Sequence, residues 1–88
     1  MKQKELEKVL KALANKRRLA IIKYLKVNHK APVGDIAGGI KLSFKATSKH
    51  LGILYAADIL EREQQNLQMF YRLAADQNHF VRHLFNLL

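Results

Sequence analysis

Three lysines recur at every fourth position in the middle of the chain, namely Lys41, Lys45 and Lys49. Residues four apart are neighbours on a helix surface, so Lys45 and Lys49 share one face if this stretch is helical. Cations in such a row can contact successive phosphates of a nucleic acid, and phosphate contacts supply much of the affinity of protein–DNA complexes. A single lysine would be an ordinary solvated charge, whereas the row indicates a nucleic-acid partner.

The side chains between these lysines suit the reading of DNA bases. The first turns of a helix in the major groove reach base edges with short polar or apolar groups. Phe44 could contact thymine methyl groups or pack against the preceding helix, and we expect it to be partly buried. His50 could touch a phosphate or fill a junction between helices, and both remain open. The candidates here are Lys41, Ser43, Phe44, Lys45, Ala46, Ser48, Lys49 and His50, joined by Arg17 from an earlier helix.

A second group of side chains, near the C-terminus, has the types that bind metals. His79 and His83 are four residues apart, a spacing that can chelate an ion, and Asp76 lies one turn earlier. Without a second matching motif, the same residues are the ordinary polar edge of a packed helix, and Asp76 is equally explained as its N-cap. We therefore predict no metal and no cofactor, and keep these three residues as minor metal candidates.

The rest of the composition narrows the class of protein. The 88 residues predict a single domain, residues 1–88, with a net charge of +9. So basic a domain favours a polyanion, either nucleic acid or an anionic membrane surface, and the lysine row favours double-stranded DNA. No apolar run approaches the length that spans a bilayer, so we expect no membrane partner. No nucleophile–base pair and no phosphate-binding glycine loop are evident, so we predict that the chain is not an enzyme.

Cysteine usage and the N-terminus bear on the compartment. The chain has no cysteine, which excludes disulfides and thiolate metal sites within it. Its first five residues, MKQKE, are charged and lack the apolar core of a signal peptide. We expect a cytoplasmic protein.

Hydrophobic periodicity predicts the elements that position the lysine row. Apolar residues at helical spacing predict a first helix over about 2–14 and a second over about 16–27, with Asn15 as the N-cap of the second. A very short extended segment over 31–33 precedes a third helix, Val33 to Ile40, and a turn at Lys41 and Leu42. Ser43 is the N-cap candidate of a fourth helix that ends near residue 55 or 56. Its inner face carries Thr47, Leu51 and Leu54.

The spacing of apolar residues changes twice in the final third of the chain. Residues 60–64 and 68–73 predict two strands, and Asn66 near the tip tolerates the left-handed conformation of a tight hairpin. From about Ala75 a helical stripe returns, and it is too apolar to remain solvated on so small a domain. The stripe either packs within its own chain or pairs two chains, and we favour the pairing. The predicted fold is mainly α with a small β-hairpin.

Four sequence motifs together point to one family. They are Leu10 to Leu19 (LKALANKRRL), Ile36-Ala37 with Leu42-Ser43 and Thr47 to Leu51 (TSKHL), Leu60 to Arg62 (LER), and Phe70 to Leu73 (FYRL). They resemble the opening motif, the helix-turn-helix and the wing strands of the arsenic-repressor-type (ArsR) winged-helix transcription factors. The resemblance covers almost the whole chain. It implies a winged helix-turn-helix with four helices, a hairpin wing and a C-terminal helix.

The resemblance also implies a function and a dimer. Members of the family are DNA-binding regulators, so we expect a sequence-specific regulator, most simply a dimeric repressor. The first and last helices pair in the family, which implies a homodimer interface formed by Leu6, Val9, Leu10, Leu13, Phe80, Val81, Leu84, Phe85 and Leu88. The wing adds Arg62, Gln64 and Gln65 as DNA candidates. The alternative function is a winged-helix module for protein–protein interaction.

Two features depart from the family pattern. The family usually has glycine in the helix-helix turn where this chain has Lys41, so either Lys41 is strained or Gly38 and Gly39 change the turn. Family wings are often basic at the tip, whereas residues 64–71 here carry no charge. The angle between the third and fourth helices and the strength of the wing contact therefore depend on the tertiary structure.

Overall fold

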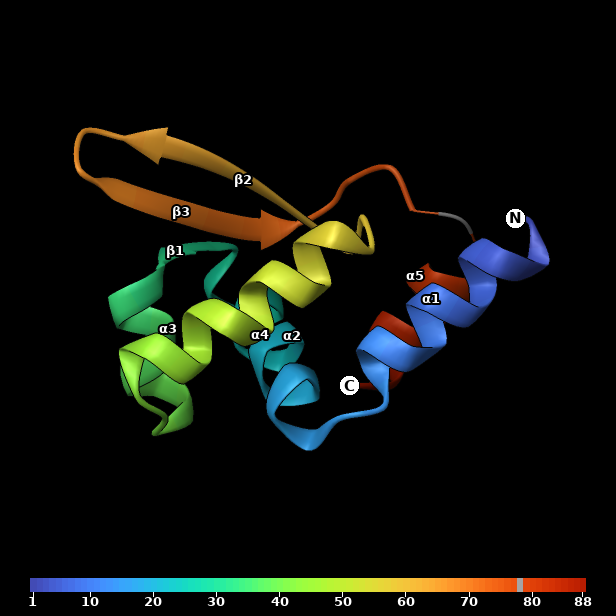
Figure 1. Ribbon diagram of the computed structural model, residues 1–88, viewed down its shortest axis with the longest axis horizontal. Coiled ribbons are helices and arrows are strands. Elements are labelled where there is room, and N and C mark those ends of the chain that lie inside the picture. Colours follow the sequence, from blue (N-terminus) through green and yellow to red (C-terminus); the bar gives the residue numbers. More distant parts are fainter. Residues whose placement is uncertain (78) are drawn as a thin grey trace.

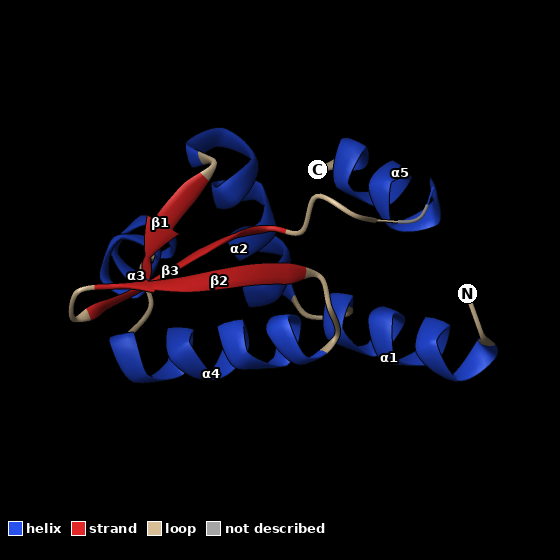
Figure 2. Cartoon of the chain, turned by 90° about the horizontal axis from the view of Figure 1, so that it is seen from above, coloured by secondary structure: helices blue, strands red, loops and turns tan. Residues whose placement is uncertain are grey.

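A computed structural model describes residues 1–77 and 79–88 of the chain, and within them five helices and three short strands form a winged helix-turn-helix (Figures 1 and 2). The elements are α1 (Gln3–Leu13), α2 (Lys16–Asn28), β1 (Lys30–Pro32), α3 (Val33–Ile40), α4 (Phe44–Ala56), β2 (Leu60–Gln65), β3 (Gln68–Leu73) and α5 (His79–Leu87). The hairpin of β2 and β3 extends past α3 at one end of the molecule, and α1 and α5 lie at the other end. The predicted order of elements is confirmed.

Side-chain caps fix where the two central helices begin. Asn15 Oδ1 accepts hydrogen bonds from the backbone N–H groups of Arg17 and Arg18, at 2.9 and 3.1 Å. Ser43 Oγ accepts one from the N–H of Ala46 at 3.1 Å. Each cap satisfies donors that have no partner inside the helix. Both predicted N-caps are confirmed.

The turn between α3 and α4 is made by Lys41 itself. Lys41 adopts the left-handed conformation, with φ 58° and ψ 50°, while no glycine among the described residues has a positive φ. The N–H of Leu42 then reaches back to the carbonyl of Ala37 at 3.0 Å and closes the helix end. A lysine in this conformation costs more than a glycine because its Cβ crowds the backbone. Of the two expected alternatives, the structure shows the strained Lys41, and Gly38 and Gly39 do not reshape the turn.

Gly39 has a packing role that its neighbour lacks. A Cβ built on Gly39 would overlap the ring of Tyr24, whereas a Cβ on Gly38 would meet nothing within 4 Å. Glycine at position 39 thus lets α3 approach α2, which places α3 and the following turn. Gly38 costs helix stability and gives no comparable contact in return.

We predict opposite effects for alanine at these two neighbouring positions. Gly39→Ala must displace Tyr24 or shift α3, so it should lower the free energy of unfolding by about 1–3 kcal/mol, as other overpacked sites do. Gly38→Ala should raise it by about 0.5–1 kcal/mol because it removes only a helix-propensity penalty. Urea unfolding of both variants measures the difference. Equal effects of the two substitutions would show that Tyr24 does not hold α3.

The core holds α4 from beneath. Ile21, Ile22 and Leu25 of α2 meet Leu51 and Leu54 of α4, and all five are at most 1% exposed. Thr47 is also fully buried, as predicted, and among the described residues its hydroxyl is the one buried side-chain polar atom without a hydrogen-bond partner. With its inner face locked in this way, α4 presents its opposite face to solvent.

The hairpin packs one face on the helices and turns the other to solvent. β3 pairs antiparallel with both β1 and β2, in the order β1-β3-β2. Leu60 and Tyr71 are buried on the inner face. Asn66 at the tip has a φ of 58°, which confirms its predicted left-handed conformation.

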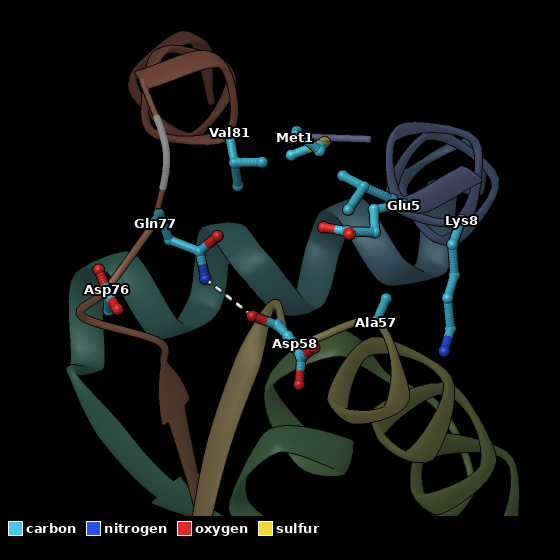
Figure 3. Close-up of a pocket in the computed structure, with 9 residues that line it drawn as sticks. Met1, Glu5, Lys8, Ala57, Asp58, Asp76, Gln77 and Val81 are labelled. Atoms are coloured by element: carbon cyan, nitrogen blue, oxygen red, sulfur yellow. Dashed lines mark hydrogen bonds between the residues drawn. The ribbon is translucent and has the colours of Figure 1, made fainter. Parts of the chain in front are cut away.

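The last helix begins later than the sequence indicates. α5 starts at His79, and Ala75, Asp76 and Gln77 are not helical, so the expected start near Ala75 and the role of Asp76 as N-cap are wrong. Gln77 explains the extended connection, because its Nε2 donates to the carbonyl oxygen of Asp58 at 2.9 Å (Figure 3). The same Nε2 also donates to the carbonyl oxygen of Ile59 at 3.4 Å. These bonds tie the segment to the corner between α4 and β2.

Candidate nucleic-acid interface

Two of the three lysines of the row lie on the exposed face of α4, and the third lies in the turn before it. Lys45 and Lys49 are exposed on the helix, and Lys41 and Ser43 are exposed just before it. Ala46 and Ser48 are half-buried between them. α4 lies across the near side of the molecule in Figure 1, with no helix or strand in front of it in that view. The structure therefore brings these predicted residues together on one accessible helix, whose lysines are free of acidic partners among the described residues.

Phe44 differs from the expectation. It is 62% exposed, so the predicted partial burial against α3 is wrong. Helical spacing places Phe44 in line with Leu51, but Phe44 is the first residue of α4 and lies about one turn before Thr47, the first buried residue of the helix. It lies at the edge of a groove between α3, α4 and the hairpin, whose lining includes Val33, Met69 and Tyr71.

Arg18 connects three helices, a role that the sequence did not reveal. Its Nε donates to the carbonyl oxygen of Ala12, and its Nη2 donates to that of Lys11 at 3.3 Å. Its Nη1 lies 3.2 Å from Nδ1 of His50 on α4. The guanidinium thus satisfies carbonyls at the end of α1 and holds α4 at the same time. In the sequence, the only sign of this junction was the pair of adjacent arginines, Arg17 and Arg18, that follows Asn15.

His50 therefore fills the junction between α2 and α4. Arginine has no acceptor, so Nδ1 of His50 must be unprotonated and its proton must sit on Nε2. Burial lowers the pKa of His50 from 6.5, and the nearby charges of Arg18, Arg17 and Lys49 lower it further. A neutral His50 matches this geometry, whereas a protonated one would face the guanidinium as a like charge.

We predict that His50 makes the protein less stable in mild acid. A histidine whose pKa is lowered by folding binds fewer protons in the native state than in the unfolded state. Its contribution to the free energy of unfolding is therefore complete above the unfolded pKa and is lost as pH falls through the folded pKa. Urea unfolding at about pH 7.5 and about pH 5.5, on either side of the ordinary histidine pKa, should show this loss. His50→Gln keeps an acceptor for Arg18 without titrating, so it should show a smaller loss. An identical pH dependence in the two proteins would contradict the prediction.

Four charged residues of the three-stranded sheet pair with one another. Arg72 contacts Glu61 at 3.1 Å and Glu63 at 3.2 Å, and Lys30 contacts Glu63 at 3.0 Å. Sequence reasoning did not include these two glutamates, although their alternation along β2 places them on the solvent face. The pairs therefore offset the positive charges of Lys30 and Arg72.

The three wing candidates are separated rather than gathered. The Arg62 guanidinium lies 3.8 Å from the ring centre of Tyr55 on α4, and a hydrogen bond with Tyr71 raises the pKa of Arg62. Gln64 and Gln65 are exposed nearer the tip, where Gln64 donates to the carbonyl of Asn66 at 3.3 Å. Arg62 therefore braces the wing against α4, and the two glutamines face solvent.

The proposed dimer residues divide into two groups. Val9, Leu13, Val81 and Phe85 are buried within the chain, so the stripe packs partly on its own core. Leu10 and Phe80 are 44% and 45% exposed, while Leu6, Leu84 and Leu88 are half-buried. The accessible group leaves an apolar surface at the end of the molecule opposite the hairpin tip.

The metal candidates do not form a site. Across residues 1–77 and 79–88, no group of three histidine, cysteine or acidic side chains is placed to hold an ion. Asp76 instead lines a hollow of about 290 Å³ between α1, the α4–β2 corner and the connection to α5 (Figure 3). His79 and His83 are exposed on α5. Among the described residues, no helix has the length and apolarity needed to cross a bilayer.

Comparison with known proteins places the chain among transcriptional regulators. No protein-family model matches it. It is 32% identical over 69 residues to the transcriptional activator HlyU of Vibrio cholerae serotype O1 (strain ATCC 39315 / El Tor Inaba N16961), a match that covers 78% of this chain and 63% of that protein. This chain thus spans less than two thirds of the length of that relative.

Solved structures agree with the sequence match. The reduced form of HlyU from Vibrio cholerae has a TM-score of 0.80 and 30% identity, over 96% of this chain and 84% of that one. A homodimeric winged helix-turn-helix DNA-binding domain from Mycobacterium bovis, of a possible ArsR-family transcriptional regulator, has a TM-score of 0.81 and 30% identity. That match covers 96% of this chain and 74% of the other.

Proposed function

The chain belongs to the ArsR family of winged helix-turn-helix transcriptional regulators, and on this premise we propose that it is a sequence-specific, homodimeric DNA-binding repressor. The observation that carries the proposal is the exposed face of α4, where Lys45 and Lys49 have no acidic partner among residues 1–77 and 79–88. Thr47, Leu51 and Leu54 fix the helix from below. A helix held in this way can enter a major groove without rearrangement. The role requires no catalysis or cofactor and belongs in the cytoplasm, where DNA is accessible.

Each candidate residue on or beside α4 has a part in the proposed complex. Lys41, Lys45 and Lys49 contact phosphates and set the register of α4 on the duplex. Ser43 and Ser48, with Ala46 between them, face the base edges. Arg17 lies close enough to His50 for its charge to lower the pKa of that histidine, and it adds positive charge there. His50 positions α4 through Arg18 rather than by touching DNA.

The dimer supplies the second recognition helix. The accessible apolar residues of α1 and α5 pair across a two-fold axis in the proposal, and the Mycobacterium bovis relative is homodimeric. Two copies of α4 then meet successive major grooves, about 34 Å apart, on a near-palindromic site. A dimer on such a site occludes a promoter that overlaps it.

Salt-dependent titration tests the DNA-binding proposal. The probe is duplex DNA from upstream of the protein's own gene, titrated at two salt concentrations. Lys49→Ala should weaken binding and reduce the slope of log K against log salt by about 0.9 for each phosphate that the protein no longer neutralises. Lys23→Ala, an exposed lysine on α2, is the matched control and should change neither value. Absence of binding even at low salt would reject the proposal and favour a protein-interaction module.

A further inference from the structure

Phe44 is a large, mostly exposed apolar side chain in the first turn of α4. Its exposed fraction, 62%, exceeds the 39% of Ile53 and the 38% of Tyr55, the other large apolar residues exposed on α4. A single exposed phenylalanine is ordinary on a protein surface, but Phe44 borders a groove that Leu67 and Met69 also line, and a partner outside the chain would bury this apolar surface. The first turn is also the part of a recognition helix that reaches base edges.

The surroundings of Phe44 combine an apolar surface with positive charge. Phe44 and the hairpin-tip residue Leu67, which is 98% exposed, border the same groove of about 450 Å³. Met69 also lines this groove. Lys41 and Lys45 flank Phe44 in sequence and are exposed. The charge selects a polyanion over an apolar peptide, and the proposed dimer surface lies at the opposite end of the molecule (Figure 1).

We propose that Phe44 contacts the 5-methyl group of a thymine in the major groove and thereby makes each half-site select thymine at one position. The inference rests on the proposed function and names the base that this site reads. Among the base edges in the major groove, the thymine methyl is the apolar group. The flanking lysines hold the phosphates on either side and bring that edge to the ring.

Uracil substitution isolates this contact, because uracil lacks the methyl group but keeps every hydrogen-bonding group of thymine. Duplexes enriched from a randomised library by the wild-type protein are resynthesised with uracil at each thymine in turn, and binding is followed by fluorescence anisotropy. At one thymine of each half-site, uracil should weaken wild-type binding about fourfold, the effect expected for burying one methyl group. Phe44→Ala should bind the thymine and uracil duplexes equally well.

Two further variants make the result specific. Phe44→Leu keeps an apolar side chain and should retain part of the discrimination. Val27→Ala truncates an apolar residue that is 72% exposed on α2, and it should discriminate as the wild type does. Circular dichroism melts of all three variants confirm that they are folded.

The outcomes separate this inference from the proposed function. Enrichment of a sequence, followed by equal wild-type affinity for its thymine and uracil forms, overturns the contact with Phe44 and leaves the DNA-binding function in place. Discrimination that persists in Phe44→Ala also overturns it. Failure of any sequence to be enriched overturns the proposed function and this inference together.

Discussion

Replacing Leu10 with glutamate is expected to separate the dimer into monomers and to weaken binding to a near-palindromic duplex by a factor on the order of 10²–10⁴. Leu10 is 44% exposed on α1 and lines a shallow apolar hollow with Leu6 and Ala14. Two charges facing each other across a two-fold axis would be desolvated without partners. The fall in affinity follows because two linked α4 helices bind with an avidity that one helix lacks.

Sedimentation and DNA titration of the same samples measure both effects. Val27→Glu places the same charge on an exposed apolar residue outside α1 and α5, and it should leave the dimer and its affinity intact. The melting curve of the Leu10→Glu monomer should remain cooperative, because the core residues Val9 and Leu13 stay in place. A variant that sediments as a dimer would move the proposed interface away from α1.

Replacing Leu51 with alanine is expected to remove a large share of the stability. Leu51 is fully buried at the centre of the contact between α4 and α2. Truncation of such a leucine costs about 2–5 kcal/mol, because it removes apolar contacts and leaves a cavity. The free energy of unfolding of a domain of this size is about 5–15 kcal/mol, so this loss is a large fraction of it. The melting temperature should fall by roughly 4–8 °C for each kcal/mol lost.

Ile53 on the same helix provides the control. It is 39% exposed, so Ile53→Ala removes a similar volume without opening a core cavity and should cost about 1 kcal/mol or less. Thermal melts must use one protein concentration, since dimerisation adds to the apparent stability. If both substitutions cost the same, the burial of α4's inner face does not hold the helix in place.

Local physics explains how much of this fold the sequence predicts. Helical spacing placed Thr47, Leu51 and Leu54 on one buried face, because that spacing depends only on helix geometry. Asn15 and Ser43 marked the starts of α2 and α4, because a cap involves a side chain and backbone groups at most three residues away. The lysine row on the opposite face of α4 follows from the same period, so the principal candidate residues were recognisable before any tertiary contact was known.

The remaining features needed contacts between residues distant in the chain. Arg18 meets His50 across 32 positions, and Gln77 meets Asp58 across 19, so neither the helix junction nor the delayed start of α5 had a local signal. The exposure of Phe44 likewise depends on where α3 lies beside α4. The sequence by itself thus determined which residues form the recognition helix and which face of it points outward. Only the tertiary structure decided what holds that helix, because its partners come from α1, α2, α3 and β2 and are brought to it by packing.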